Sequence, residues 1–186
     1  MILDCSKYVG PCRCGREHTL ETKKVVVEYN ALDKFDQYMD EVGLSGKRAV
    51  IYDTNTYNLP TLRHVRADQE IVLNAEGLHS EKGMIEDMMR QLDHPDVIVA
   101  VGSGTIMDFG RYPAYKLGIP FVAIPTLASS DGFTANICSA ILNGQKKSTP
   151  MCAPSQTVPF SSIEQPSTVT LSPMRTSRMN LAPTMR

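Results

Sequence analysis

The sequence predicts an α/β fold in which helices cover both faces of a parallel sheet. Short runs rich in valine and isoleucine recur along residues 24–125, and amphipathic helical patterns lie between most of them. The last two runs are apolar throughout, as expected of strands that are buried on both faces. With 186 residues, the chain is long enough for one domain with a core of its own.

The elements follow one another in an alternating order. We expect strands over residues 24–28, 48–53, 70–73, 97–101 and 121–125, and helices over residues 31–42, 81–92 and 105–117. Gly43 and Gly118 follow two of these helices, where glycine commonly ends a helix. Ser80 is placed to cap the second helix, and Pro113 should kink the third because it lacks an N–H group. This alternation predicts a Rossmann-like sheet with right-handed crossovers.

Composition divides the chain into three parts. Residues 1–23 form an N-terminal segment with cysteines, residues 24–147 form the Rossmann-like domain, and residues 148–186 form an aberrant tail. Of those last 39 residues, 19 are Ser, Thr or Pro and only four are charged, and no glycine follows Gly144. Because such a segment buries too little apolar area to offset its ordering entropy, we expect it to be disordered or poorly packed.

The charge balance argues against several classes of partner. The chain has 19 Lys and Arg against 20 Asp and Glu, which leaves no basic excess for nucleic acid or an anionic membrane. No apolar run is long enough to cross a bilayer, and the N-terminus does not resemble a secretory signal. Five cysteines are most simply interpreted as reduced thiols. We therefore expect a cytoplasmic protein with neither nucleic-acid nor membrane partners.

A glycine loop, Gly102-Ser103-Gly104, joins the expected strand 97–101 to the next helix. Backbone N–H groups and the positive end of a helix dipole at this point favour a phosphate or pyrophosphate. Thr105 and Asp108 stand in the spacing of a capping box, so they also favour helix initiation. The alternative is a tight turn without a ligand, since Met107 stands where the usual dinucleotide fingerprint has its third glycine.

Two further polar segments follow expected strands and should lie at the same edge of the sheet. Asp53 ends the strand 48–53, and a carboxylate there can hold ribose hydroxyls, although an Asx turn or helix cap is the alternative. Residues 126–133 follow the last strand. Their small hydroxyl side chains can contact a nicotinamide or phosphate, and Asp131 can bind a substrate hydroxyl. The alternative there is a polar loop closed by Asp-Gly.

Taken in order, these segments resemble the motifs of the glycerol-1-phosphate dehydrogenases. They read Asp-x-Asn-Thr from Asp53, Gly-x-Gly-Thr-Ile-x-Asp from Gly102 and Pro-Thr-x-x-Ser-x-Asp-Gly-Phe from Pro125, while residues 12–18 are similar to bacterial members. The resemblance covers roughly residues 10–154. It places the chain in the superfamily of iron-containing alcohol dehydrogenases, glycerol dehydrogenase and dehydroquinate synthase.

This resemblance implies a Rossmann-like domain followed by a helical C-terminal domain. It also implies that members of the family form homo-oligomers. It implies NAD(P)H-dependent interconversion of dihydroxyacetone phosphate, a small phosphorylated substrate, and sn-glycerol 1-phosphate. Zinc or another divalent metal would polarise the substrate oxygen. Asp53 would hold the adenosine ribose, Gly102, Ser103, Gly104, Thr105 and Ile106 would cradle the pyrophosphate, Thr126 and Ser129 would line the nicotinamide side, and Asp131 would contact substrate. The family's cofactor-contacting serine is Ala135 here.

The chain also departs from the family that it resembles. The family's metal is held by an Asp and two His of the helical domain, whereas His18, His64, His79 and His94 all precede the glycine loop, and no Asp follows Asp131. We expect the helical domain to be missing, the residues after 154 to be out of frame, and the chain to be weakly active or inactive. The alternatives are a glycerol or polyol dehydrogenase-like protein, a non-catalytic nucleotide-binding remnant, and a fragment that does not fold stably.

Cysteines near the N-terminus form a second candidate site. They could supply a four-ligand zinc site made of Cys5, Cys12, Cys14 and His18, since zinc prefers thiolate and imidazole ligands. The Cys-x-Cys spacing is shorter than that of common zinc knuckles, so the alternative is a set of free thiols. The sequence leaves both interpretations open, and it also leaves open the choice between NAD and NADP.

Overall fold

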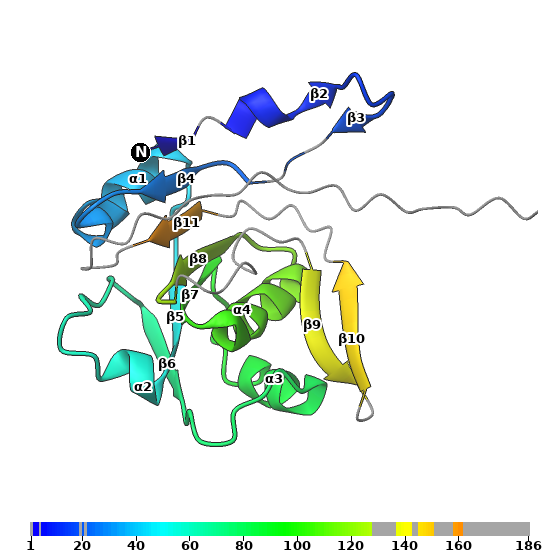
Figure 1. The fold of residues 1–186 in the computed structure, drawn as a ribbon. Coiled ribbons are helices and arrows are strands. Elements are labelled where there is room, and N and C mark those ends of the chain that lie inside the picture. The colour runs from blue at the N-terminus through cyan, green and yellow to red at the C-terminus, as the bar shows by residue number, and fades with distance from the viewer. Residues whose placement is uncertain are drawn as a thin grey trace, which may run out of the picture.

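The structure is a computed structural model, which describes residues 2–3, 5–18, 20, 22–127, 137–142, 145–150 and 158–161 (Figure 1). The strands are β1 (Ile2–Leu3), β2 (Gly10–Pro11), β3 (Glu17–His18), β4 (Val25–Val27), β5 (Arg48–Asp53), β6 (Gln69–Leu73), β7 (Val97–Gly102), β8 (Phe121–Pro125), β9 (Ile137–Leu142), β10 (Gln145–Pro150) and β11 (Val158–Ser161). The helices are α1 (Phe35–Glu41), α2 (Thr54–Tyr57), α3 (Lys82–Met89) and α4 (Gly104–Leu117), with 3-10 helices η1 (Cys5–Tyr8) and η2 (Ala31–Lys34).

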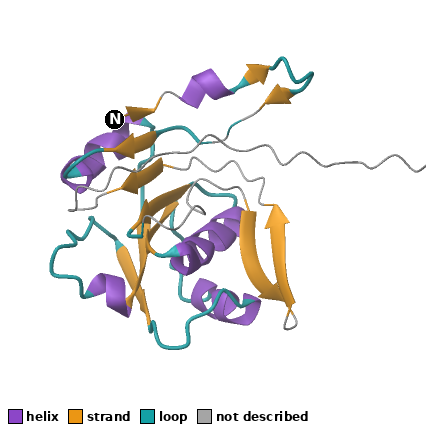
Figure 2. Cartoon of the chain, viewed as in Figure 1, coloured by secondary structure: helices purple, strands orange, loops and turns teal. Residues whose placement is uncertain are grey.

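A seven-stranded sheet in the order β1-β4-β11-β8-β7-β5-β6 forms the centre of the molecule. β1 pairs with β4 in the antiparallel direction, and every other neighbouring pair is parallel. Figure 2 shows helices on either side of these strands. The Rossmann-like α/β fold is therefore confirmed, and each of the five expected strands is present.

Successive side chains of the central strands point to opposite faces of the sheet, and they form a separate core on each face. On β5, Val50 and Tyr52 pack with α1 on one face of the sheet. Ala49 and Ile51 pack on the other face, in a cluster with residues of α3, α4 and β9. All residues of β5, β7 and β8 are buried. Burial on both faces is what makes these strands apolar throughout, and it holds their carboxyl ends in place.

The helix ends agree with the sequence in some places and differ in others. Gly118 ends α4 in the left-handed region at φ 67°, as expected. The segment 31–42 begins as η2 before it becomes α1. Ser80 does not cap α3, because Glu81 occupies that position and the Ser80 hydroxyl donates to Asp108 at 3.0 Å. The expectation for Ser80 was therefore wrong.

Close packing of α4 against the sheet depends on Gly110. A Cβ at this position would lie 2.6 Å from Phe121 Cε2 and 2.7 Å from Ala100 Cβ. Such contacts are shorter than van der Waals separation, so no larger residue fits without a shift of the helix. Met107, at the position of the fingerprint's third glycine, is fully buried in the same core. Gly110 thus permits the close helix–strand approach that the fingerprint assigns to its third glycine.

Two strands lie in the part of the chain that we expected to form an aberrant tail. β10 extends past residue 148 to Pro150 and pairs with β9, and β11 inserts between β4 and β8. The open edges of β4 and β8 offer backbone hydrogen bonds to a segment whose own pattern does not reveal a strand. The division into three parts stays a prediction, and residues 162–186 lie outside the described residues.

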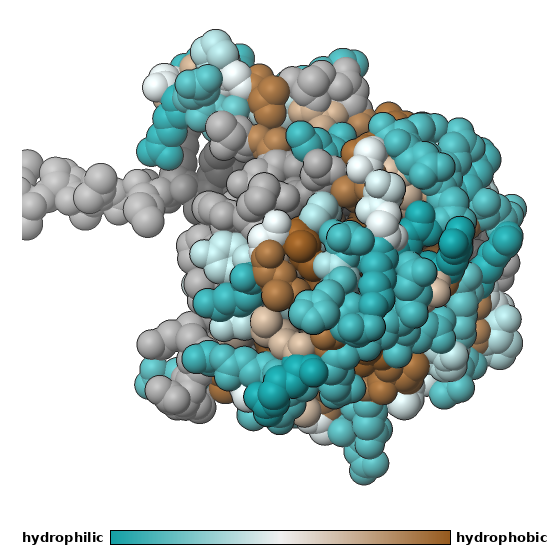
Figure 3. Space-filling model, turned by 180° about the vertical axis from the view of Figure 1, so that it is seen from behind, coloured by the Kyte–Doolittle hydropathy of each residue, from teal (hydrophilic) through white to brown (hydrophobic). Residues whose placement is uncertain are grey.

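The face turned to the viewer in Figure 3 is mainly hydrophilic, with separate hydrophobic areas between the polar ones. Exposed large apolar side chains over the described residues include Tyr29 and Leu127. Single exposed apolar side chains are usual on protein surfaces. In the described part of the chain, no helix has the length and apolar character needed to cross a membrane.

Candidate nucleotide site at the sheet edge

The carboxyl ends of β5 and β7 lie at the topological switch point of the sheet, where the chain connections leave in opposite directions. After β5 the chain continues through α2 to β6 on one side, whereas after β7 it continues through α4 to β8 on the other side. β5 and β7 are themselves direct neighbours, with Tyr52 opposite Val101. In open α/β sheets, ligands bind in the crevice at such a switch point.

Asp53 stands at this switch point and is buried, with 7% of its surface exposed. It is the N-cap of α2: Oδ1 accepts from the backbone N–H of Thr56 at 2.8 Å, and Oδ2 accepts from the Thr56 hydroxyl at 3.0 Å. The helix-cap alternative is therefore correct as a local role. Each carboxylate oxygen has a further lone pair, so the cap leaves capacity for a ligand hydroxyl.

Gly102 brings the glycine loop and Asp53 into contact. A Cβ at Gly102 would lie 3.1 Å from Asp53 Oδ2 and 2.9 Å from Ile106 Cγ1. The Gly102 carbonyl also accepts from the backbone N–H of Thr126 at 3.0 Å. The structure therefore brings together one residue from each of the three predicted motifs, at the ends of three adjacent strands.

The N-terminus of α4 begins directly beside this contact. Ser103 is the N-cap, but its side chain makes no capping hydrogen bond. The capping box predicted for Thr105 and Asp108 is therefore wrong, because the N-cap lies two residues earlier than that box requires. With no side-chain cap, the backbone N–H groups of the first turn are oriented to bind an anion, and the dipole of this 14-residue helix favours negative charge there.

Asp108 instead joins α4 to its neighbours. Its carboxylate accepts from the Ser80 hydroxyl at 3.0 Å and from the backbone N–H of Ser139 at 3.3 Å, and it lies 3.9 Å from Arg111 Nη1. Burial lowers the pKa of Arg111, an effect that the charge of Asp108 opposes. Burial, together with Asp108, raises the pKa of Cys138 to about 12. This network is not predictable from the sequence, since the partners of Asp108 come from β9 and from the loop before α3.

Several predicted site residues lie outside the described residues. Ser129, Asp131 and Ala135 belong to the segment 128–136, of which the structure describes nothing. Their predicted roles toward the nicotinamide and the substrate are therefore untested. Ser103, Gly104, Thr105 and Ile106 are described, and they lie at or directly after the end of β7 as expected.

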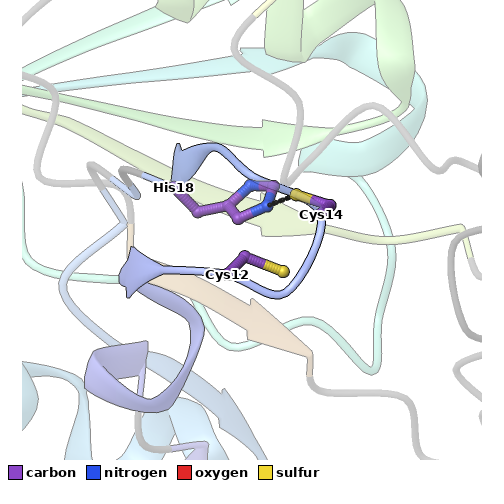
Figure 4. Close-up of side chains that lie close together, drawn as sticks. All are labelled: Cys12, Cys14 and His18. Atoms are coloured by element: carbon purple, nitrogen blue, oxygen red, sulfur yellow. Dashed lines mark hydrogen bonds between the residues drawn. The ribbon is translucent and has the colours of Figure 1, made fainter.

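Side chains of the types that bind metal ions lie close together in the N-terminal hairpin of β2 and β3, not at the sheet edge. Over the described residues, one group of three or more His, Cys, Asp or Glu has its ligand atoms within 4.8 Å of one another, and it consists of Cys12, Cys14 and His18 (Figure 4). Cys5 is buried and does not belong to it. The hydrogen bond from His18 is the largest of the effects that lower the pKa of Cys14 to about 7. Among the described residues, the sheet edge therefore carries no group of an Asp and two His such as the family resemblance implies.

Fold and site together define a Rossmann-like α/β protein in which residues of three motifs meet at the switch point of its sheet. The family model described as iron-containing alcohol dehydrogenase matches residues 26–162. The chain belongs to this family. The match extends past residue 154, where the sequence resemblance was expected to fade.

Curated relatives agree with this assignment. The glycerol-1-phosphate dehydrogenase [NAD(P)+] of Bacillus licheniformis is 32% identical over 165 residues, which are 83% of this chain and 41% of the relative. The enzyme of the same name from Halalkalibacterium halodurans is 32% identical over 158 residues, which are 78% of this chain and 39% of the relative. The chain therefore spans about two fifths of the length of the relatives it matches.

Solved structures show the same fold at lower identity. An iron-containing alcohol dehydrogenase of Thermotoga maritima matches with a TM-score of 0.60 and 18% identity, over 78% of this chain and 47% of that one. A glycerol dehydrogenase of Schizosaccharomyces pombe matches with a TM-score of 0.59 and 21% identity, over 74% of this chain and 36% of that one.

Proposed function

We propose that the carboxyl edge of β5, β7 and β8 binds NAD(P)H in an oxidoreductase of the glycerol-1-phosphate dehydrogenase type. Asp53 accepts from the adenosine ribose hydroxyls, and the loop from Gly102 to Ile106 holds the pyrophosphate. Thr126 and Ser129 line the nicotinamide side, and Asp131 contacts dihydroxyacetone phosphate or sn-glycerol 1-phosphate. The names of the curated relatives support both the cofactor and the phosphorylated substrate class.

One observation carries this proposal. Three motifs that lie far apart in the sequence meet at the switch point of the sheet, where Gly102 approaches Asp53 and hydrogen-bonds to Thr126. A tight turn without a ligand requires neither a buried carboxylate beside the glycine nor an uncapped helix N-terminus. This arrangement supports the proposal, because a dinucleotide presents its ribose hydroxyls and its pyrophosphate next to each other.

Chemically, the chain's own residues bind and orient the cofactor. The first-turn amides of α4 donate to the pyrophosphate, and the helix dipole stabilises its charge without a counter-ion. The bound nicotinamide supplies hydride transfer, which no side chain can perform. Buried strands beneath the site hold these groups in a fixed arrangement, so little ordering is needed when the cofactor binds.

Turnover needs a group that these residues do not provide. In the family that the chain resembles, a metal polarises the substrate oxygen, which is worth several kcal/mol at the transition state. All four histidines of this sequence precede the glycine loop, and none belongs to the three motifs. We therefore propose that the 186-residue polypeptide by itself binds the dinucleotide with little or no turnover.

Calorimetric titration of the 186-residue chain with NADH and with NADPH tests the proposal. We expect saturable binding at one site per chain for at least one of the two nucleotides. A second arm adds dihydroxyacetone phosphate and a divalent metal and follows NADH oxidation, where we expect no ordinary turnover. Absence of binding by either nucleotide contradicts the site, whereas full activity contradicts only the statement about the metal.

A further inference from the structure

The N-terminal hairpin of β2 and β3 carries a cluster of two thiols and an imidazole, away from the sheet-edge site (Figures 1 and 4). We propose that this hairpin binds one Zn²⁺ through Cys12 Sγ, Cys14 Sγ and His18 Nε2, with the fourth coordination position open to water. The proposal is independent of the function proposed above, because it concerns residues that the nucleotide site does not use.

Backbone geometry brings these ligands together despite their short spacing. Gly10 pairs with His18 across the hairpin, and the Cys12 N–H donates to the Arg16 carbonyl at 2.9 Å. The Gly15 N–H donates to the Cys12 carbonyl at 2.9 Å, and Gly15 adopts φ +80°, which is a left-handed conformation. The tight loop therefore brings Cys12, Cys14 and His18 close together, whereas an extended chain would spread these residues along one face of a strand.

The distances fit a tetrahedral zinc site. Zinc binds sulfur at about 2.3 Å and imidazole nitrogen at about 2.0 Å, which sets ligand-to-ligand distances of roughly 3.5 Å in a tetrahedron. Cys14 Sγ lies 3.2 Å from His18 Nε2. All three ligand atoms lie within 4.8 Å of one another. Cys12 Sγ therefore needs to move by at most about 1 Å to reach the tetrahedral separation.

The hairpin has little else to stabilise it. β2 and β3 have two residues each, and every residue from Pro11 to His18 is exposed. An isolated hairpin of this size is marginal in water, because it buries no core to offset its ordering entropy. A structural metal supplies that free energy in other small motifs. Two thiols and an imidazole are the donors that favour zinc over magnesium or calcium.

Cobalt and zinc titrations of the reduced, metal-free 186-residue protein test the site. Co²⁺ should produce a thiolate-to-metal charge-transfer absorption that saturates at one equivalent, and Zn²⁺ should abolish it by displacement. Cys12→Ser, Cys14→Ser and His18→Gln should each weaken zinc affinity at least about 100-fold. His79→Gln, which alters an exposed histidine outside the cluster, should leave zinc affinity unchanged.

Two further results would overturn the proposal. The first is a wild-type protein that gives no thiolate-to-cobalt band, or a band that survives in Cys14→Ser. The second is loss of the band in Cys5→Ser while its circular dichroism spectrum stays that of the wild type, because that result would assign a ligand role to a residue outside the three-ligand site. Circular dichroism of each ligand variant separates loss of a ligand from loss of the fold.

Discussion

The sheet edge and the N-terminal hairpin both gather chemically active side chains, but different forces hold them there. At the sheet edge, Asp53 and Gly102 end strands whose residues are all buried, so the core places them whether or not a ligand is present. In the hairpin, the cluster of Cys12, Cys14 and His18 is exposed. A buried framework makes a preorganised site, whereas an exposed cluster depends on its ligand for order.

The largest effect is expected from Gly102→Ala. The new Cβ would lie 2.9 Å from Ile106, which is fully buried, and 3.1 Å from the Asp53 carboxylate. Both must shift, and the first turn of α4 shifts with them. We expect NADH affinity to fall at least about 100-fold, or about 2.7 kcal/mol, in calorimetric titration.

Gly83→Ala is the matched control for that variant. Gly83 lies in α3 with nothing within 4 Å of an added Cβ, so the substitution should leave binding unchanged and stabilise the fold by up to about 1 kcal/mol. Equal NADH affinities for Gly102→Ala and the wild type would show that the glycine loop does not hold the nucleotide.

Gly110→Ala tests whether the core places the site. Its Cβ would overlap Phe121 and Ala100, so we expect the free energy of unfolding to fall by about 1–3 kcal/mol in urea denaturation. Zinc affinity of the hairpin should not change, since the hairpin makes no use of this packing. A variant as stable as the wild type would show that α4 does not need the close approach.

Asp53→Asn separates the ligand role of Asp53 from its capping role. Asparagine can still accept from the Thr56 N–H, so the stability of the fold should be retained. Only one acceptor oxygen remains for ribose hydroxyls, and we expect NADH affinity to fall about 10-fold, or about 1.4 kcal/mol. Asp53→Ala should also cost about 1 kcal/mol of stability by thermal unfolding. If Asp53→Asn binds NADH like the wild type, Asp53 is a cap alone.

The smallest effect concerns the hairpin without metal. The His18 hydrogen bond contributes most to the lowered pKa of Cys14, which is about 7, so the thiolate fraction should rise through neutral pH. Site-resolved alkylation with iodoacetamide should therefore accelerate from pH 6 to 8, with a midpoint of about 7. In His18→Gln the midpoint should move to higher pH. An unchanged midpoint would mean that His18 does not act on this thiol.

The parts of this architecture that the sequence predicts are those set by burial. Valine- and isoleucine-rich runs predict β5, β7 and β8 because both faces of these strands are covered. The strands β10 and β11 were not predicted, because β10 is mainly polar, β11 contains a proline, and β11 pairs with β4 and β8, which lie far away in the sequence. The strand β9 is mostly apolar, but it pairs with β10 outside the main sheet, so the strand–helix alternation does not reveal it. The role of Gly110 was not predicted either, because it depends on Phe121 and Ala100 across the helix–sheet interface.

At the candidate site, motif order predicts which segments meet but not how they meet. The contact between Gly102 and Asp53 depends on β5 and β7 being neighbours, which follows from the crossover after β6. The capping assignments for Ser80 and Thr105 failed because tertiary partners compete for the same polar side chains: the Ser80 hydroxyl bonds Asp108 instead.

Hydrogen exchange with and without NADH, read by mass spectrometry on the 186-residue chain, tests the central claim most directly. If the switch point of the sheet is the dinucleotide site, NADH should slow exchange in peptides that contain the first turn of α4 and the end of β5. Exchange in the hairpin at residues 10–18 should stay the same and should slow only when Zn²⁺ is added. Protection by NADH that is absent from the first turn of α4, or that appears in the hairpin instead, would contradict the account.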